Sequence, residues 1–240
     1  MPPLPALNGI SLFLDIDGTL LDLVDRPDLV VADAPLKALL TRLAARLDGR
    51  LAVVSGRSIA QIDHILGDVA QHIAVSGSHG SEYRWQGVSA HPARPPALGE
   101  IARQFAAFAA AHPGVLVEDK SFGVALHYRM APLAEADALR LAQDLADRHG
   151  LLVQPGKMMI ELRPAGGDKG TAVATLMDRP PMAGTRPIFI GDDATDEPAF
   201  VAAQALGGLA ILIGSRHPTA ATCALADPAA LRGWLEALAA

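Results

Sequence analysis

The chain has 240 residues and a formal net charge of -6. It carries no run of Lys or Arg, which argues against nucleic acid or an anionic membrane surface as a partner. Half of its residues are apolar and only 19% are charged, so wholesale disorder is excluded and a sizeable core is expected. The single cysteine, Cys223, excludes an intrachain disulfide framework and a multi-cysteine zinc site. Because we find neither a secretory-signal pattern nor a membrane-spanning apolar stretch, we expect a cytoplasmic protein without a membrane partner.

Strand-like and helix-like patterns alternate in the first third of the chain. Short apolar runs predict strands over residues 10–14, 51–54 and 73–75, and helical periodicity covers residues 34–47 and about 58–66. Such alternation is typical of βα units, and it predicts an α/β fold with a mainly parallel sheet.

The pattern changes after a Pro-rich connector at residues 91–96. Two helices, at about 98–111 and 133–149, are each followed by a pair of strand-like runs, at 115–119 with 122–128 and at 151–154 with 158–162. We place the second hairpin turn at Pro155-Gly156. The α/β rhythm returns with helices at 168–177, 195–203 and 228–238 and strands at 187–190 and 209–213. We therefore predict a core domain formed by 1–88 and 165–240, with an inserted α+β cap domain at 89–164.

Two carboxylates directly follow the first predicted strand. Asp15 and Asp17 stand at its C-terminal end, before the turn Gly18-Thr19. Ligands of open α/β sheets bind at that end of the strands, and two neighbouring acids repel unless a cation lies beside them. A hard divalent metal such as Mg²⁺, or a phosphate bound through it, fits this position. Taken alone, the tripeptide fits a solvated turn equally well.

A second acidic segment, residues 191–197, follows the strand predicted over 187–190. If the two strands are neighbours, Asp15, Asp17 and Asp192 could share one octahedral Mg²⁺ with water and a phosphate oxygen. In the alternative reading, these residues cap the next helix, whose dipole favours acids. Both can hold, with Asp196 capping while Asp192 binds the metal.

Two further segments offer groups for a phosphate. Ser55 ends the second strand at a helix start, where a hydroxyl and backbone N–H groups can cradle a phosphate, and Arg57 adds a positive charge. Lys169 stands at the start of a predicted helix, where the dipole disfavours a cation. Each feature is common by itself, as a helix entry or as an exposed lysine.

In this order along the chain, the four pieces resemble the hallmarks of the haloacid dehalogenase superfamily of phosphotransferases. The resemblance implies a Rossmannoid core in which Asp15 is the nucleophile and forms an aspartyl-phosphate. It implies that Asp17 is the general acid and then the base. Ser55 and Lys169 would bind the phosphoryl group, and Lys169 would also restrain Asp15. Phosphoryl transfer depends on positioning and neutralised charge, which agrees with this set of residues.

The inserted segment carries the charged strings V-E-D-K, H-Y-R and G-K-M-M-I-E-L-R-P. Strand periodicity puts the charged residues of each string on one face: Glu118 with Lys120, His127 with Arg129, and Lys157 with Glu161. Such a face suits a polyhydroxylated ligand, because charged groups form strong hydrogen bonds with hydroxyls. It equally suits a solvated sheet with cross-strand ion pairs.

With these strings, the chain resembles the trehalose-6-phosphate phosphatases over residues 12–214. The resemblance implies a Mg²⁺-dependent enzyme of trehalose biosynthesis that takes a small sugar phosphate and releases trehalose and phosphate. It also implies that cap side chains hold the disaccharide: Glu118, Lys120, Arg129, Lys157 and Glu161. Residues 79–82 match the family's H-G-x-E segment, whose role stays open. Residues 18–22 depart from the family, which has a Pro soon after the Thr.

Three alternatives remain beside this hypothesis. They are a phosphatase for another sugar phosphate on the same fold, a phosphomutase, which would need a phosphorylated sugar to return to the site, and a non-catalytic sugar-phosphate sensor. Intact Asp15, Asp17, Lys169 and Asp192 argue against the sensor, because a binding protein needs no acid at Asp17. The sequence does not indicate the oligomeric state.

Overall fold

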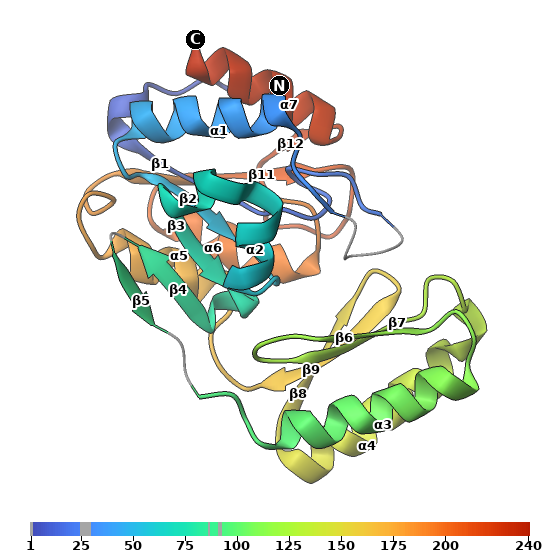
Figure 1. Ribbon diagram of the computed structural model, residues 1–240. Coiled ribbons are helices and arrows are strands. Elements are labelled where there is room, and N and C mark those ends of the chain that lie inside the picture. Colours follow the sequence, from blue (N-terminus) through green and yellow to red (C-terminus); the bar gives the residue numbers. More distant parts are fainter. Residues whose placement is uncertain (1, 25–29, 86, 91–92) are drawn as a thin grey trace. The chain divides into compact units, whose positions relative to one another are not determined.

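A computed structural model describes residues 2–24, 30–85, 87–90 and 93–240 (Figure 1). The chain forms two compact units, Met1–His91 with Gly167–Ala240 and Pro92–Gly166. The domain limits given above, at 88/89 and 164/165, stay a prediction, and His91 and Pro92 of the predicted connector lie outside the described residues. Among the described residues, no helix has the length and apolar character needed to cross a membrane.

The first unit contains one eight-stranded sheet in the order β12-β11-β10-β1-β2-β3-β4-β5. All pairs from β12 to β3 are parallel, while β3–β4 and β4–β5 are antiparallel. The mainly parallel sheet is therefore confirmed. The bounds are β1 Ile10–Leu14, β2 Leu51–Val54, β3 Ala74–Gly77, β4 Glu82–Trp85, β5 Val88–Ala90, β10 Arg186–Gly191, β11 Leu209–Ile213 and β12 Cys223–Leu225.

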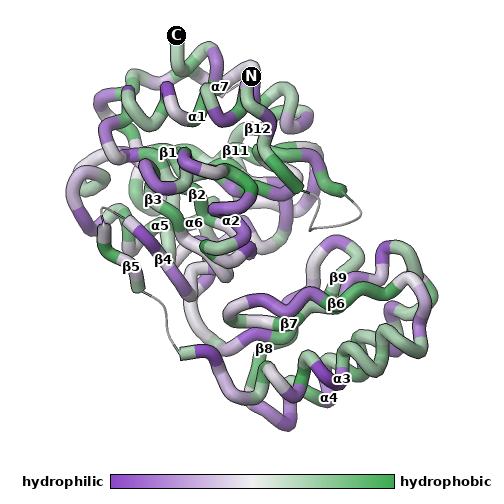
Figure 2. Tube along the Cα trace, in the orientation of Figure 1, coloured by the Kyte–Doolittle hydropathy of each residue, from purple (hydrophilic) through white to green (hydrophobic). Residues whose placement is uncertain are grey.

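Helices cover both faces of this sheet. Alternate strand side chains point to opposite faces, so Leu12 and Leu14 pack with α1, α2 and α7, while Phe13 packs with α5 and α6. Figure 2 shows the hydrophobic colour along the inner strands of this unit. The helices are α1 Ala34–Leu47, α2 Ile59–Leu66, α5 Lys169–Met177, α6 Glu197–Ala205 and α7 Pro228–Ala239, with 3₁₀ turns η1 Leu7–Gly9, η3 Gly67–Gln71, η4 Ser78–Gly80 and η6 Ala194–Asp196. Together they form a three-layer α/β sandwich.

The second unit is a four-stranded antiparallel sheet in the order β6-β7-β9-β8. Apolar side chains from one face of this sheet pack against α3 and α4. The bounds are α3 Ala97–Ala111, β6 Leu116–Asp119, β7 Val124–His127, η5 Pro132–Ala134, α4 Glu135–His149, β8 Leu151–Gly156 and β9 Met159–Pro164. The α+β character predicted for this segment is confirmed.

The prediction for the second hairpin turn is wrong by two residues. Pro155 and Gly156 continue β8, opposite Ile160 and Met159, and the turn is Lys157-Met158, with Met158 at φ 58°. A proline is tolerated there because β8 is an edge strand and needs no donor on its open side. Lys157 therefore belongs to a turn and does not share a strand face with Glu161.

Candidate active site

Three neighbouring strands bring polar residues to one edge of the eight-stranded sheet. Strands β10, β1 and β2 lie side by side in parallel, and Asp192, Asp15 and Ser55 follow their respective C-terminal ends. The N–H of Asp15 donates to the carbonyl of Ile190 at 3.0 Å. The loops after β1 and β10 therefore begin at the same level of the sheet. Asp15 and Asp192 are therefore close, as expected if their strands are neighbours.

The Asp-x-Asp-Gly-Thr loop folds tightly against Asp192. Gly18 has φ +77°, and a Cβ at this position would lie 2.2 Å from Oδ2 of Asp192, so only glycine fits. The hydroxyl of Thr19 donates to Oδ1 of Asp192 at 3.4 Å. The Gly-Thr pair thus makes room for the second acidic segment and holds it.

Lys169 is enclosed by carboxylates. Its Nζ lies 2.8 Å from Oδ1 of Asp15 and 2.7 Å from Oδ1 of Asp196, and the lysine side chain is only 3% exposed. Burial acts to lower the pKa of Lys169, but the neighbouring carboxylates outweigh it and raise the pKa above its ordinary value. Lys169 therefore stays charged, and its place at the start of α5 is explained by these acids.

Asp196 joins Lys169 to the loop after β10. Its Oδ2 accepts the N–H groups of Asp192 at 2.9 Å and Asp193 at 3.0 Å, while Oδ1 accepts from Lys169. The capping reading of this segment also holds, because Asp193 and Asp196 form a capping box at η6. The contact with Lys169 was not predicted. The only sequence signal for it is an acid four residues after Asp192.

Three carboxylates share a small buried volume here. One oxygen each from Asp15, Asp192 and Asp196 lies within 4.8 Å of the others. Burial raises the pKa of Asp15, Lys169 lowers it, and Asp196 and Asp192 raise it further, so the pKa of Asp15 stands well above its usual value. A buried set of hard oxygen donors with surplus negative charge fits a cation such as Mg²⁺.

Asp17 does not join this carboxylate cluster. Its two oxygens accept from Arg57, Oδ2 from Nε and Oδ1 from Nη2, both at 2.6 Å. Of the predicted metal ligands Asp15, Asp17 and Asp192, the structure brings together the carboxylates of Asp15 and Asp192. The full ligand set stays a prediction.

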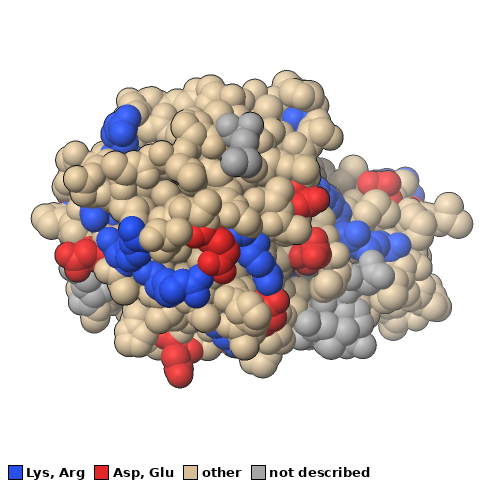
Figure 3. All heavy atoms as spheres, turned by 90° about the horizontal axis from the view of Figure 1, so that it is seen from above, with Lys and Arg blue, Asp and Glu red and all other residues tan. Residues whose placement is uncertain are grey.

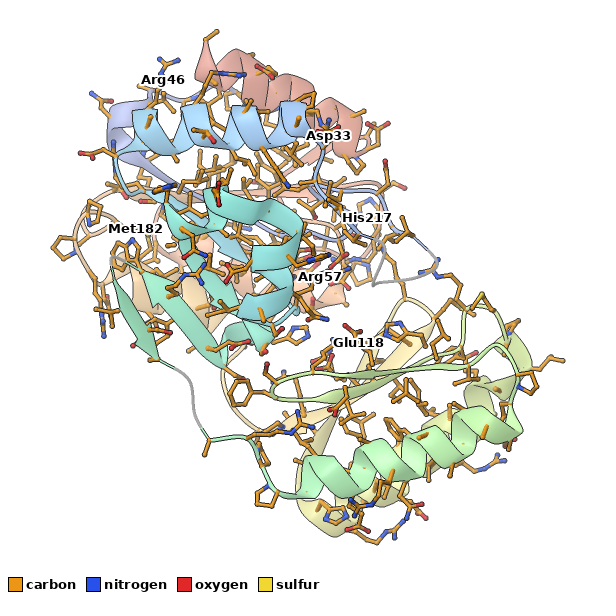
Figure 4. The ribbon with its side chains drawn as sticks, viewed as in Figure 1. Asp33, Arg46, Arg57, Glu118, Met182 and His217 are labelled. Carbon is orange, nitrogen blue, oxygen red and sulfur yellow. The ribbon has the colours of Figure 1, made fainter. Side chains whose placement is uncertain are left out.

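The two residues predicted for phosphate binding on the second loop lie together. Ser55 is 1% exposed, and its Oγ accepts the N–H of Arg57 at 3.2 Å. Arg57 lies beside the start of α2 (Figure 4), with its guanidinium directed to Asp17. The bidentate Arg57–Asp17 pair was not predicted, because the two residues are 40 positions apart and nothing in either motif indicates the pairing.

Two charged residues of the second unit's sheet, Glu118 and Glu161, lie on the sheet face opposite α3 and α4. Glu118 and Glu161 lie in one cross-strand row, either side of Ala125. Oε2 of Glu118 lies 2.8 Å from Nε2 of His127, and Oε2 of Glu161 accepts from Nζ of Lys120 at 2.5 Å. Figure 4 labels Glu118 on this sheet. The contact of Lys120 with Glu161 is an ion pair of the predicted kind, while the contact of Glu118 with His127 is a hydrogen bond between β6 and β7. Glu118, Lys120 and Glu161 were also predicted to bind sugar.

The other two predicted sugar-binding residues lie in turns. Arg129 follows β7 and Lys157 follows β8, and Nη2 of Arg129 donates to the carbonyl of Lys157 at 3.4 Å. The expectation that Arg129 shares a strand face with His127 is therefore wrong. Arg163 was not among the predicted site residues, yet it is 7% exposed and its Nη2 donates to Oε1 of Gln154 at 3.2 Å.

Comparison with known proteins gives a consistent result. The sequence model of the trehalose-phosphatase family matches residues 13–229. A Sinorhizobium fredii protein named "Probable trehalose-phosphate phosphatase" is 41% identical over 237 residues, covering 97% of this chain and 89% of that protein. The Escherichia coli protein named "Trehalose-6-phosphate phosphatase" is 36% identical over 227 residues, covering 93% of this chain and 84% of that protein.

Solved structures share the fold. The crystal structure of a trehalose-6-phosphate phosphatase related protein superposes with a TM-score of 0.82 at 28% identity, over 96% of both chains. The C-terminal domain of the C. albicans trehalose-6-phosphate phosphatase, at 22% identity, superposes with a TM-score of 0.84 over 97% of this chain and 93% of that one. The predicted fold class, a haloacid dehalogenase-like core with an inserted α+β domain, is confirmed. Its motifs, its fold and its match over most of its length show that the chain belongs to the trehalose-phosphatase family.

Proposed function

We propose that this protein is a Mg²⁺-dependent phosphatase that hydrolyses trehalose 6-phosphate to trehalose and phosphate. The observation that carries the mechanism is Asp15, buried at a strand end with one oxygen 2.8 Å from Lys169. The choice of substrate is supported by the names of the relatives. The partner is thus a small sugar phosphate, and a cytoplasmic location stays a prediction. Acidic and basic side chains are interspersed on the face in Figure 3, which gives no support to nucleic acid as a partner.

In the first step, an oxygen of Asp15 attacks the phosphorus and the bond from phosphorus to the sugar oxygen breaks. The product is an aspartyl-phosphate, and Asp17 gives its proton to the departing sugar oxygen. Lys169 holds the attacking carboxylate in one orientation, and Ser55 with its neighbouring backbone N–H groups receives the phosphoryl oxygens.

In the second step, Asp17 takes a proton from water while the water oxygen attacks the phosphorus. The bond to Asp15 breaks, free phosphate leaves, and Asp15 returns as a carboxylate. Asp17 must be released from Arg57 to reach these oxygens, and the charge of the incoming phosphoryl group gives Arg57 another partner.

Asp15 and Asp192 offer the carboxylate oxygens for Mg²⁺, with Asp17 as the third predicted ligand. The cation would supply the positive charge that this cluster lacks, lower the pKa of Asp15 and neutralise phosphoryl oxygens. In the second unit, Glu118, Lys120, Arg129, Lys157 and Glu161 would bind sugar hydroxyls. Glutamate accepts from hydroxyls and lysine or arginine donates to them, so the mixed set suits a disaccharide.

The test is phosphate release from a panel of sugar phosphates, with Mg²⁺ and after exhaustive chelation. We expect turnover of trehalose 6-phosphate above that of sucrose 6-phosphate and glucose 6-phosphate, and we expect chelation to stop it and Mg²⁺ to restore it. A preference for another sugar phosphate would reject the substrate and keep the phosphatase. Full turnover without a divalent cation would reject the metal.

A further inference from the structure

The turn between β3 and β4 has an unusual backbone. Three successive residues lie in the left-handed region, Ser78 at φ 49°, His79 at φ 54° and Gly80 at φ 90°. A left-handed conformation is strained for residues with a Cβ, and it persists only where surrounding contacts hold it. These residues belong to the Ser-His-Gly-Ser-Glu string, residues 78–82, to which the proposed mechanism assigns no role.

The first two residues of this turn hold the phosphate loop, residues 55–57. The N–H of Ser78 donates to the carbonyl of Arg57 at 2.8 Å, and the N–H of His79 donates to the carbonyl of Ser55 at 3.1 Å. The imidazole of His79 also packs on Gly56, where a Cβ would lie 2.5 Å from Nε2. Two consecutive amides therefore fix both ends of the phosphate loop.

The third residue packs against the start of α5. A Cβ on Gly80 would lie 2.7 Å from the carbonyl oxygen of Asp168, the residue before Lys169. The turn thus contacts both segments predicted to bind the phosphoryl group, the phosphate loop and the N-terminus of α5. It therefore lies against the segment that carries Ser55 and against the residue that precedes Lys169.

Glu82 holds the turn in this shape. Its Oε1 accepts the hydroxyl of Ser78 at 2.7 Å and the N–H of Ile59 at 3.0 Å. Glu82 is 7% exposed, so both hydrogen bonds are shielded from water. One buried oxygen therefore connects the strained turn to Ile59, the first residue of α2, two residues after the phosphate loop.

We propose that Glu82 is a positioning residue for phosphoryl binding, acting through Ser78–Gly80 on the phosphate loop and on the start of α5. The inference rests on the proposed function, because it assumes that Ser55 and Lys169 receive a phosphoryl group. It extends that function by assigning a role to the Ser-His-Gly-Ser-Glu string.

Arg84, on the same strand, provides a matched control. It connects β4 to α2 at a second point, through Asp63 at 2.8 and 2.6 Å and the carbonyl of Ala70 at 2.9 Å. If Glu82 served only to attach β4 to α2, Arg84→Leu and Glu82→Leu would have the same effect on phosphate binding. If Glu82 positions the phosphate loop, only Glu82→Leu will weaken that binding.

The experiment measures the dissociation constant of inorganic phosphate by titration calorimetry in Mg²⁺, beside melting temperature and turnover. We expect Glu82→Leu to raise this dissociation constant about tenfold or more. In Glu82→Gln the constant should stay within about threefold of the wild-type value, because the amide oxygen still accepts both hydrogen bonds. In Arg84→Leu it should also stay within about threefold. Equal changes in Glu82→Leu and Arg84→Leu, or no change in Glu82→Leu, would overturn the proposal.

Three further outcomes are decisive. If Glu82→Leu does not fold, Ser78→Ala removes the hydroxyl alone, and an unchanged phosphate constant in that variant overturns the proposal. If the wild type binds phosphate but does not hydrolyse trehalose 6-phosphate, the proposed function fails while the calorimetry still decides the role of Glu82. A wild type that binds no phosphate overturns the role proposed for Glu82, while turnover of trehalose 6-phosphate still decides the proposed function.

Discussion

Asp15 lies between charges of both signs. Lys169 contacts one of its oxygens, while Asp192 and Asp196 add negative charge to the same buried volume. The pKa of Asp15 is raised by burial and by these acids, against the effect of Lys169. A raised pKa means that the folded state favours the protonated form of Asp15. Ionisation of Asp15 therefore reduces the stability of the folded state as the pH rises. Reactivity and stability are therefore opposed at this residue.

Asp15→Asn should abolish turnover of trehalose 6-phosphate without lowering stability. The amide is not a competent nucleophile, but it resembles the protonated carboxyl that the buried site favours. Phosphate release and the melting temperature without metal are the measurements, and the melting temperature should be equal or higher. Wild-type turnover in the purified, folded variant would remove the covalent mechanism.

Asp196→Asn should lower both stability and turnover. One oxygen of Asp196 accepts from Lys169 and the other from two backbone N–H groups, so an amide must turn its NH₂ toward a donor on one side. Leaving buried charged or polar groups unpaired costs about 2–4 kcal/mol. Denaturant unfolding measures the loss. Asp193→Asn is the stability control, since Oδ1 of Asp193 accepts the N–H of Thr195 and an amide oxygen can accept it too. Equal losses of stability in the two variants would contradict the role given to Asp196.

At the scale of elements, the loop after β11 supports the loop after β10. Arg216 pairs with Glu197 at the start of α6 and donates to the carbonyl of Asp193 at 3.1 Å. Oε2 of Glu197 in turn accepts the N–H of Ala220 at 2.7 Å. Burial acts to raise the pKa of Glu197, but the N–H of Ala220 and the Arg216 guanidinium outweigh it and lower the pKa. The acidic motif is therefore held from outside as well as by Lys169.

Glu197→Gln should reduce stability at neutral pH by about 1 kcal/mol, the usual size for a partly exposed charged hydrogen bond. Because the folded-state pKa is depressed, the contribution of Glu197 is fully present above the ordinary carboxyl pKa of 4.5 and is lost as the pH falls through the lower folded value. Urea unfolding at pH 7 and at decreasing acid pH tests this. The gap between wild type and variant should narrow in acid, and a gap that stays constant would contradict the assignment.

At the scale of the whole molecule, the chain divides the proposed reaction between two units. The groups proposed for chemistry belong to the α/β unit, and the groups proposed for the sugar belong to the antiparallel sheet of the other unit. The two sets should therefore respond differently to substrates of different size. A small aryl phosphate has no sugar hydroxyls for the second unit to bind.

Glu161→Gln should lower kcat/KM for trehalose 6-phosphate about 10- to 100-fold, the usual range for one lost charged hydrogen bond. Hydrolysis of an aryl phosphate should change less than about threefold, since the catalytic groups are intact. Asp119→Asn is the control, because Asp119 is half exposed, pairs with Arg94 at 2.5 Å and lies outside the predicted sugar-binding set. Equal losses on both substrates would show that Glu161 supports folding and not recognition.

Much of the fold could be predicted because its signals are local. The inner strands are continuous apolar runs, and the helices between them have their own periodicity and caps, such as Asp33 at the start of α1. The outer strands β4, β5 and β12 were missed. Strand β4 carries the charged residues Glu82 and Arg84, and the edge strands β5 and β12 have only three residues each, so apolar patterning does not reveal them.

The candidate site could also be predicted only in part. Asp15, Ser55 and Asp192 could be placed at strand ends from the sequence, because each directly follows an apolar run. Three contacts could not be predicted: the pairing of Arg57 with Asp17, the contact of Lys169 with Asp196, and the hydrogen bonds that Ser78 and Ile59 donate to Glu82. Each joins residues that no pattern relates, and the choice among possible charged partners depends on where the loops lie in space.

The sequence by itself determined the α/β class, the inserted α+β segment, the family and the residue types offered for phosphoryl chemistry. These follow from periodicity and from short motifs that are contiguous in the chain. Only the tertiary structure decided which carboxylates share one buried volume, which lysine lies among them and which turn holds the phosphate loop. Those outcomes depend on strand order, because the sheet brings β10, β1 and β2 side by side from distant parts of the chain. Because the site is buried, the pKa of each ionisable group in it then depends on its nearest charged neighbours.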